Sequence, residues 1–371
     1  MIPYGRQEIT QKDIDAVESV LRSDLITQGD VVPKFEKAVA NYVGAKFGVA
    51  VNSATSALHI ACLALDLKPN DWLWVSPITF VASANCGLYC GAKIDFVDID
   101  DKSFNICPKK LEQKLVLAEK LMCLPKVIVV VHLCGQSAEM KKIYDLSKKF
   151  SFKIIEDASH AIGGKYKNEF IGNGHYSDIT VFSFHPVKII TSGEGGMALT
   201  NHSHIAEKMS LLRSHGITRE KHKMTKEPDG AWYYQQVELG FNYRMTDIHA
   251  ALGLSQLSRL DHYIMRRNQV ADVYNKAFRT LPVKTPRIHK NCYSSFHLYI
   301  IRIEFDKIGL TQSKVFEGLQ HRGIGVNKHY IPVFSQPYYK KMGFNESSFP
   351  NANKYYDEAI SLPIYPALSH K

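Results

Sequence analysis

Residues 179–196 read ITVFSFHPVKIITSGEGG. The β-branched and aromatic run at the start of this segment predicts a strand, which stops at the His185-Pro186 pair because proline cannot donate to a strand ladder. Glycines within residues 193–196 then allow a tight turn before a second apolar run. Lys188 therefore lies on a short loop between two strands, where its amine is held at a fixed position, as covalent chemistry at an amine requires.

A second predicted strand, residues 152–156, leads into Asp157 and the small-residue turn 158–164. In parallel sheets, ligands bind beyond the carboxyl ends of the strands. We therefore expect Lys188 and Asp157 to meet at one edge of a sheet and to form a site. The alternative is that Lys188 is an ordinary loop lysine in a chain with 46 Lys and Arg residues.

Strand and helix patterns alternate along the first part of the chain. Strand patterns occupy residues 47–51, 72–76, 94–97, 127–132 and 152–156, and helix patterns occupy residues 9–21, 79–90 and 138–150. Strands separated by helical crossovers indicate an α/β fold with a mainly parallel central sheet and helices on both faces.

The later part of the chain has a different pattern. Residues 217–236 are polar and predict a mobile loop, and residues 246 to about 281 predict one long helix. The remaining patterns, which indicate a smaller α+β layer, are a strand at 296–303, a helix at 312–322 and a strand at 324–330.

Length and composition limit the class of protein. A chain of 371 residues with 45% apolar and 22% charged residues is an ordinary globular protein, too long for one core. We expect a large domain over residues 1–245 and a small C-terminal domain over residues 246–371. No apolar run is long enough to cross a bilayer, and we see no export signal. The seven cysteines contain no C-x-x-C pair, so reduced thiols in a cytoplasm fit best.

The net charge of +10 is compatible with two kinds of partner. Nucleic acid is one, but most basic residues are scattered and no helix-turn-helix or zinc-finger pattern is present. A nucleotide carrying a diphosphate would be attracted by the same surface. No group of His, Cys, Asp and Glu has the spacing of metal ligands, so we expect no metal.

A helix begins just after the first strand, within residues 52–60. The free backbone N–H groups and the dipole of a helix N-terminus attract anions. Thr55 and Ser56 are therefore candidates for binding a phosphate. A simple helix cap fits the same pattern.

Several motifs together resemble a known family. Residues 156–161 (EDASHA) and 183–188 (SFHPVK), with 194–196 (EGG), are similar to the DegT/DnrJ/EryC1/StrS family of sugar-nucleotide aminotransferases, and the likeness runs from residue 4 to about 366. The resemblance implies a pyridoxal-phosphate-dependent transferase of fold type I, like aspartate aminotransferase, with pyridoxamine phosphate between its two half-reactions.

The resemblance also assigns cofactor-binding roles. Lys188 would hold the cofactor as a Schiff base and then move a proton as the catalytic base and acid. Asp157 would keep the pyridine nitrogen protonated. The other implied contacts are Thr55, Ser56 and Ser183 at the phosphate, Phe80 stacked on the ring and His160 near the ring oxygen. Core packing for Phe80 and a structural role for His160 are the alternatives.

The remaining implied contacts concern the substrate and a second subunit. The candidate substrate-binding residues are Tyr4, Thr27, Gln28, His185, His329 and Tyr330. Turn chemistry would equally explain Thr27 and Gln28, and a structural role would equally explain His185. Asn242, within residues 240–247 (GFNYRMTD), matches a segment that meets the cofactor phosphate of the neighbouring subunit, which implies a homodimer with shared active sites. A plain turn before the next helix is the alternative.

Within the family, residues 79–85, 183–194 and 212–216 are most similar to the pseudaminic acid branch. This likeness implies amino transfer from L-glutamate to the C4 ketone of UDP-2-acetamido-2,6-dideoxy-β-L-arabino-hexos-4-ulose, for a surface glycan or flagellin glycosylation. Other nucleotide-linked 4-keto sugars, of the perosamine, aminoarabinose or bacillosamine type, remain open. A non-catalytic regulatory or nucleic-acid-binding protein on the same fold is the distant alternative.

Overall fold

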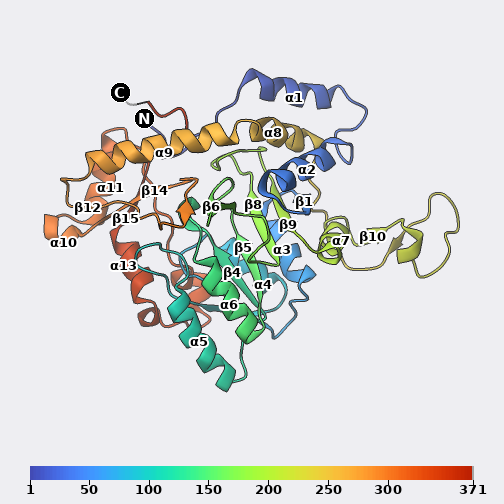
Figure 1. Cartoon of the computed structure of the whole chain (residues 1–371), viewed down its shortest axis with the longest axis horizontal. Helices are drawn as coiled ribbons and strands as arrows, with labels where there is room; N and C mark the ends of the chain where they lie inside the picture. The colour runs from blue at the N-terminus through green and yellow to red at the C-terminus, as the bar shows by residue number, and fades with distance from the viewer. Residues whose placement is uncertain (370–371) are drawn as a thin grey trace.

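The computed structural model describes residues 1–369 and is built around a seven-stranded sheet in the order β1-β9-β8-β5-β4-β2-β3 (Figure 1). The strands are β1 (Phe47–Val51), β2 (Trp72–Val75), β3 (Lys93–Phe96), β4 (Val127–Val131), β5 (Lys153–Asp157), β8 (Ile179–Ser183) and β9 (Gly196–Thr200). Strand β9 is antiparallel to both of its neighbours, and the other six strands point in one direction. The predicted mainly parallel sheet is confirmed.

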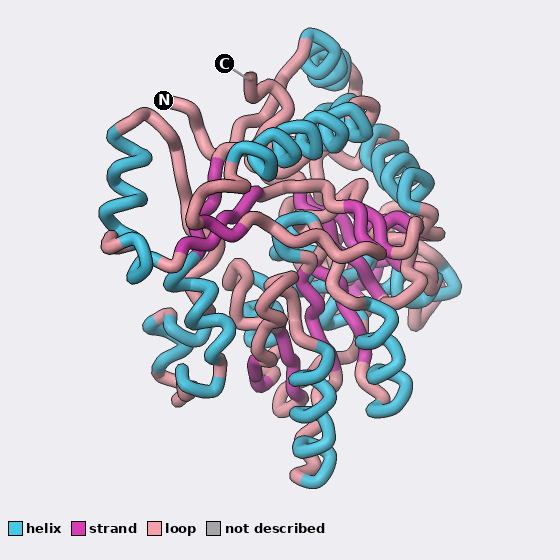
Figure 2. The backbone as a smooth tube through the Cα atoms, turned by 60° about the vertical axis from the view of Figure 1, so that its left-hand side comes forward, coloured by secondary structure: helices cyan, strands magenta, loops and turns pink. Residues whose placement is uncertain are grey.

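Helices cover both faces of this sheet (Figure 2). The helices around it are α2 (Val31–Val43), α3 (Ala54–Ala64), α4 (Ala82–Tyr89), α5 (Pro108–Lys120), α6 (Met140–Phe150) and α7 (Ser203–Leu212). On one face Val129 and Ile155 share a core with α3 and α4, whereas Ile128 and Ile154 pack with α5 and α6 on the other. Because alternate side chains are buried on opposite faces, these strands are nearly continuous apolar runs.

The prediction of one long helix from residue 246 is wrong, because the chain forms α8 (Asp247–Leu257) and α9 (Leu260–Ala277). At the break, the Ser258 hydroxyl donates to the Ser255 carbonyl. The Arg259 guanidinium donates to both carboxylate oxygens of Asp13 on α1 (Gln11–Leu21), at 2.7 and 2.6 Å. The apolar periodicity continues across the break, so a tertiary contact decides where the first helix ends.

A second, antiparallel sheet lies in the C-terminal part of the chain. It contains β12 (Val283–Lys284), β14 (Tyr299–Ile303) and β15 (Ala359–Leu362). The helices of this part of the chain are α10 (Phe305–Ile308), α11 (Gln312–His321), α12 (Pro337–Lys340) and α13 (Pro350–Glu358). The predicted strand at 324–330 is wrong, because this segment makes isolated bridges from Ile324 to Ile2 and from Asn327 to Ser361. The division into domains at residue 245 stays a prediction.

Residues 217–236 form a hairpin rather than an irregular loop. Its short strands, β10 (Ile217–Thr218) and β11 (Gln235–Gln236), pair with each other, and the hairpin projects from the body of the molecule (Figure 1). The predicted mobility of this segment is untested. A third small sheet joins β13 (Cys292–Tyr293), β6 (Lys165–Tyr166) and β7 (Glu169–Phe170). Within residues 1–369, no helix combines the length and apolarity needed to span a membrane.

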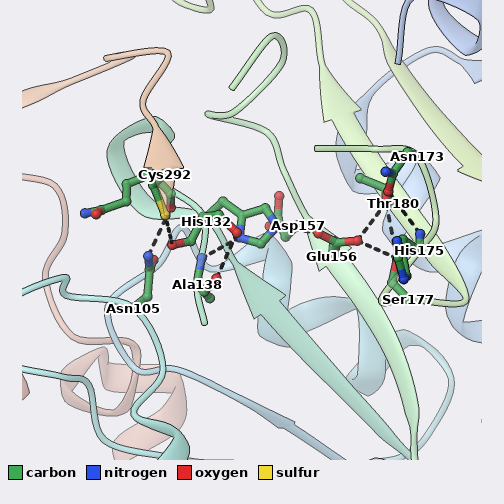
Figure 3. Close-up of polar contacts among 12 residues, drawn as sticks. Asn105, His132, Ala138, Glu156, Asp157, Asn173, His175, Ser177, Thr180 and Cys292 are labelled. Carbon is green, nitrogen blue, oxygen red and sulfur yellow. Dashed lines mark hydrogen bonds and ion pairs between the residues drawn. The ribbon is translucent and has the colours of Figure 1, made fainter. Parts of the chain in front are cut away.

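A buried polar network fixes strand β5 just before its end (Figure 3). The backbone N–H of Ala138 donates to His132 Nδ1 at 3.1 Å, so Nδ1 is an acceptor and the ring hydrogen lies on Nε2. This Nε2–H donates to Glu156 at 2.6 Å, and the hydroxyls of Ser177 and Thr180 donate to the other carboxylate oxygen. Burial alone would raise the pKa of Glu156, but these hydrogen bonds, led by that from His132, lower it below its usual value. Glu156 is therefore a buried, ionised acceptor.

We predict that Glu156→Gln destabilises the protein by about 2–4 kcal/mol, because the amide cannot accept from His132 Nε2–H while it also accepts from both hydroxyls. Glu169→Gln is the matched control, since Glu169 pairs with His175 at 2.8 Å on the surface. Its loss should change the free energy of unfolding by less than about 0.5 kcal/mol. Urea denaturation measures both values, and equal effects of the two substitutions would contradict the network.

Candidate active site

A cavity of about 680 Å³ lies at the carboxyl ends of β5 and β8. It brings together eleven of the predicted site residues: Tyr4, Thr55, Ser56, Phe80, Asp157, His160, Ser183, His185, Lys188, His329 and Tyr330. A larger hollow of about 1040 Å³ at the outer strand β3 contains none of them. We therefore place the candidate active site in the smaller cavity.

Lys188 is positioned by the short connection between β8 and β9. Its backbone N–H donates to the His185 carbonyl at 2.9 Å, which closes a turn, and the buried side chains of Ile189 and Ile190 anchor the loop behind it. Burial lowers the pKa of the Lys188 amine to about 8, although the negative charge of Asp157 acts in the opposite direction. About a tenth of this amine is therefore neutral at pH 7, far more than for an ordinary lysine.

Asp157, the last residue of β5, is buried and held by three donors. The Ser83 hydroxyl donates to one carboxylate oxygen at 2.6 Å. The other oxygen accepts from the hydroxyl and the backbone N–H of Ser159, at 2.6 and 3.2 Å. These hydrogen bonds hold the carboxylate in one orientation, in the cavity that also contains the Lys188 amine.

The N-terminus of α3 forms the polar end of the cavity. Ser53 caps the helix by accepting from the Ser56 N–H at 3.1 Å, and the Ser56 hydroxyl donates to Asn52 at 2.6 Å. Thr55 also lines the cavity. A Cβ atom at Gly196 would lie 2.5 Å from the Ala54 nitrogen, so this glycine lets β9 begin against the helix terminus. The result is an anion site of the expected kind, in which the hydroxyl of Ser56 is already engaged.

Phe80, three histidines and Tyr330 form the opposite wall. Phe80 is 58% exposed, and its ring centroid lies 6.2 Å from that of Tyr330, so it is not a core residue. His329 Nδ1 contacts the Ser361 hydroxyl at 2.8 Å, and burial followed by the Lys188 charge lowers the pKa of His329 to about 4. His160 contacts Tyr330, and its ring centroid is 4.4 Å from that of His297. The wall is therefore uncharged at neutral pH.

Three predicted residues lie outside this cavity. Thr27 and Gln28 are exposed, because Asp247 accepts from the backbone N–H groups of Gly29 and Val31 and so ties this turn to the start of α8. Asn242 is also exposed; its backbone carbonyl accepts from the Asn52 side chain at 3.4 Å, but Asn242 is not part of the lining of its own chain's cavity. The structure of one chain thus does not bring these three residues to the site.

The sequence interpretation missed three residues of the site. Ser159 lies two positions after Asp157, which is a recognisable spacing for a local side-chain turn. Ser83 lies one helical turn after Thr79, whose hydroxyl it contacts at 2.7 Å, but nothing local indicates that it faces Asp157. His297 comes from the segment before β14, and its buried Nδ1 has no hydrogen-bond partner among the described residues. No sequence signal pointed to it.

Comparison with known proteins agrees with this geometry. The DegT/DnrJ/EryC1/StrS aminotransferase family matches residues 7–371. The chain is 39% identical over 372 residues to the UDP-4-amino-4,6-dideoxy-N-acetyl-beta-L-altrosamine transaminase of Campylobacter jejuni, covering 100% of this chain and 94% of that protein.

Two solved structures are similar over the whole chain. Helicobacter pylori PseC, an aminotransferase involved in the biosynthesis of pseudoaminic acid, has a TM-score of 0.88 and 32% identity, with 100% of this chain and 95% of that one covered. The sugar aminotransferase Spr1654 from Streptococcus pneumoniae, in its PMP form, has a TM-score of 0.89 and 30% identity, with 100% and 96% covered.

Pyridoxal phosphate, the cofactor of these aminotransferases, fits the residues of the cavity. The α3 N-terminus, left open by Gly196, suits a phosphate, and Ser183 lies beside it in the lining. Asp157 suits a protonated pyridine nitrogen, and the Lys188 amine suits an aldehyde carbon. The exposed face of Phe80 suits stacking on an aromatic ring.

We predict that Lys188 reacts with pyridoxal phosphate at a lower pH than an ordinary lysine, because the pKa of its amine is about 8 rather than about 10.4. The rate at which borohydride traps pyridoxal phosphate on Lys188 should rise with pH and reach half of its maximum near pH 8. Asp157→Asn removes the charge that raises this pKa, so the midpoint should move to lower pH. Mass spectrometry of the trapped peptide measures the rate, and a midpoint near 10 would contradict the prediction.

Proposed function

The chain belongs to the DegT/DnrJ/EryC1/StrS aminotransferase family, and from this membership we propose that it transfers an amino group from L-glutamate to the C4 ketone of UDP-2-acetamido-2,6-dideoxy-β-L-arabino-hexos-4-ulose. The product would be UDP-4-amino-4,6-dideoxy-N-acetyl-β-L-altrosamine, in the pseudaminic acid pathway. The coarser activity, that of a pyridoxal-phosphate-dependent sugar-nucleotide aminotransferase, follows from the family and its named members.

The observation that supports this substrate most directly is the identity of 39% with the Campylobacter jejuni transaminase, which extends along the whole chain. The likeness to PseC in backbone structure also covers the whole chain. This likeness includes both the sheet that carries Lys188 and the C-terminal segment that carries His329 and Tyr330. The site and the wall opposite it thus both support the assignment.

Lys188 would be the residue that moves the proton. Bound pyridoxal phosphate supplies an electron sink for the pair of electrons that remains when a proton leaves carbon. The Lys188 amine, with its pKa lowered to about 8, is neutral often enough to take that proton and charged often enough to return it. Its anchored loop keeps the nitrogen on one side of the cavity.

The other residues would bind and hold charge. Asp157 would face the pyridine nitrogen, with its carboxylate oriented by hydrogen bonds from Ser83 and Ser159. Thr55 and Ser183 would bind the phosphate with the backbone of the α3 N-terminus. The opposite wall would be neutral and would therefore place no second positive charge beside that of Lys188. It is formed by His160, His297, His329 and Tyr330.

We also propose that two copies of the chain share their active sites. Asn242 is exposed and lies outside its own cavity, and it directly follows a stretch with an unusually exposed apolar surface, in which Trp232 is 74% and Leu239 77% exposed. A second copy that covers these side chains would place an Asn242 amide at the phosphate end of its partner's cavity. Dimers with such a self-complementary contact are the commonest oligomers.

The substrate is tested by offering the enzyme, pyridoxal phosphate and L-glutamate together with UDP-, dTDP- and GDP-linked 4-keto sugars in competition. We expect the UDP-linked β-L-arabino ketone to be aminated with a kcat/KM at least about tenfold above the others, corresponding to one additional good hydrogen bond. NMR identifies the product. Amination of a dTDP- or GDP-linked ketone in preference would favour the perosamine-type alternative.

The shared site is tested by mixing two inactive variants, Lys188→Ala and Asn242→Asp, of which the second places a carboxylate against the phosphate. If Asn242 acts in trans, each mixed dimer has one intact site, and activity should recover to about a quarter of the wild-type value after subunit exchange. Each variant alone should remain inactive. No recovery, with dimers verified by light scattering, would show that Asn242 does not serve the partner's site.

A further inference from the structure

A chain of two hydrogen bonds crosses the wall of the cavity at His160. The backbone N–H of Cys134 points at His160 Nδ1, with a nitrogen–nitrogen distance of 3.3 Å. On the other side of the ring, His160 Nε2 lies 3.0 Å from the Tyr330 hydroxyl oxygen. Both ring nitrogens of His160 are therefore engaged within the protein. The sequence resemblance implies that His160 itself lies near the cofactor's ring oxygen. In this structure it has no free ring nitrogen with which to bind that oxygen.

The first of these hydrogen bonds fixes the direction of the second. A backbone N–H only donates, so Nδ1 of His160 must be the acceptor and cannot carry a hydrogen. In a neutral ring the single hydrogen is then on Nε2, which must donate to Tyr330. The hydroxyl oxygen of Tyr330 accepts this bond, and its own hydrogen turns elsewhere.

The surroundings of His160 keep its ring neutral. The pKa of His160 is held well below its ordinary value, first by burial. The positive charge of Lys188, and that of a protonated His329, would lower this pKa further. The ring of His297, tilted at 46° with its centroid 4.4 Å away, also has its pKa lowered, first by burial and then by the charges of its cationic neighbours. No carboxylate forms a hydrogen bond with His160 among the described residues. The Nε2–H form therefore persists across the physiological pH range.

We propose that His160 is a positioning residue that orients the Tyr330 hydroxyl as a hydrogen-bond donor toward an oxygen of the bound ligand. Tyr330 lines the cavity, and its ring lies beside the exposed ring of Phe80. No other side chain or backbone acceptor of the described chain takes its hydrogen.

The fitting ligand group is an oxygen that accepts and does not need to donate, such as a ketone, a carboxylate or a phenolate. A free tyrosine hydroxyl would serve donors and acceptors alike, whereas this one already accepts from His160 and has its hydrogen free, so it favours an acceptor. The direction of the hydrogen bond stands on the geometry alone, and only the identity of the ligand rests on the proposed function.

Two substitutions at His160 separate the two hydrogen bonds. Asn places an amide oxygen where Nδ1 lies, so His160→Asn keeps the acceptor for Cys134 but loses the donor to Tyr330. Gln reaches the position of Nε2 with an N–H, so His160→Gln restores that donor. Tyr330→Phe removes the oriented hydroxyl. For each variant we would measure the dissociation constant of pyridoxamine phosphate with the apoprotein, the KM of the keto sugar and the KM of L-glutamate.

We expect His160→Asn and Tyr330→Phe to weaken one of these three parameters by about 5- to 30-fold, the value of one hydrogen bond. The parameter that changes identifies the ligand that supplies the oxygen. His160→Gln should recover to within about threefold of the wild type, and the double variant His160→Asn/Tyr330→Phe should be no worse than either single variant. Equal losses in the Asn and Gln variants, additive losses in the double variant, or no change in any parameter would overturn the proposal.

The hydrogen on the ring is also observable without any reaction. Long-range proton–nitrogen NMR spectra of protein labelled in its histidine rings should show His160 protonated on Nε2 and not on Nδ1, with the signal assigned by its loss in His160→Asn. A hydrogen on Nδ1 would overturn the proposal. If the enzyme aminated none of the tested sugars, the proposed function would fail. The NMR spectrum and the dissociation constant of pyridoxamine phosphate would still test the role of His160.

Discussion

The site depends on holding a carboxylate and an amine in one cavity at the edge of the sheet. The carboxylate of Asp157 is buried and accepts hydrogen bonds from fixed donors of Ser83 and Ser159. Burial disfavours the charged form of the Lys188 amine and lowers its pKa to about 8, and the negative charge of Asp157 offsets only part of this effect. The carboxylate is thus fixed in orientation, and the amine beside it is able to exchange a proton near neutral pH.

The reversed strand β9 explains why the lysine lies at the same edge as the carboxylate. A parallel connection after β8 would need a crossover that carries the chain to the opposite edge of the sheet. Because β9 is antiparallel to β8, residues 184–195 instead form a tight connection at the carboxyl end of β8. The same strand starts at Gly196, which packs against the helix terminus expected to bind the phosphate. One change of strand direction thus positions both the amine and the anion site.

Site residues whose positions follow from the local sequence could be predicted, whereas residues positioned by tertiary contacts could not. Asp157 and Lys188 end or follow apolar strands, and the helix after β1 has a readable cap, so their grouping follows from the fold class. The break between α8 and α9 depends on Arg259 reaching Asp13, which no periodicity reveals. His297 becomes a wall residue only because the second sheet packs against the first. The places of Thr27, Gln28 and Asn242 depend on contacts that one chain does not supply.

The wall opposite the lysine shows why the segment at 324–330 is not a strand. As part of a regular ladder, its side chains would alternate between two faces of the small sheet. Instead, His329 is held to Ser361 of β15 through Nδ1 and to Tyr355 of α13 through its carbonyl, and the next residue, Tyr330, extends to His160, which follows β5. These two neighbouring residues are thereby tied to the small sheet and to the segment after β5 of the large sheet. Any displacement of β15 relative to β5 would move the Tyr330 hydroxyl away from His160, so the hydrogen-bonding character of the wall depends on the two sheets being correctly docked.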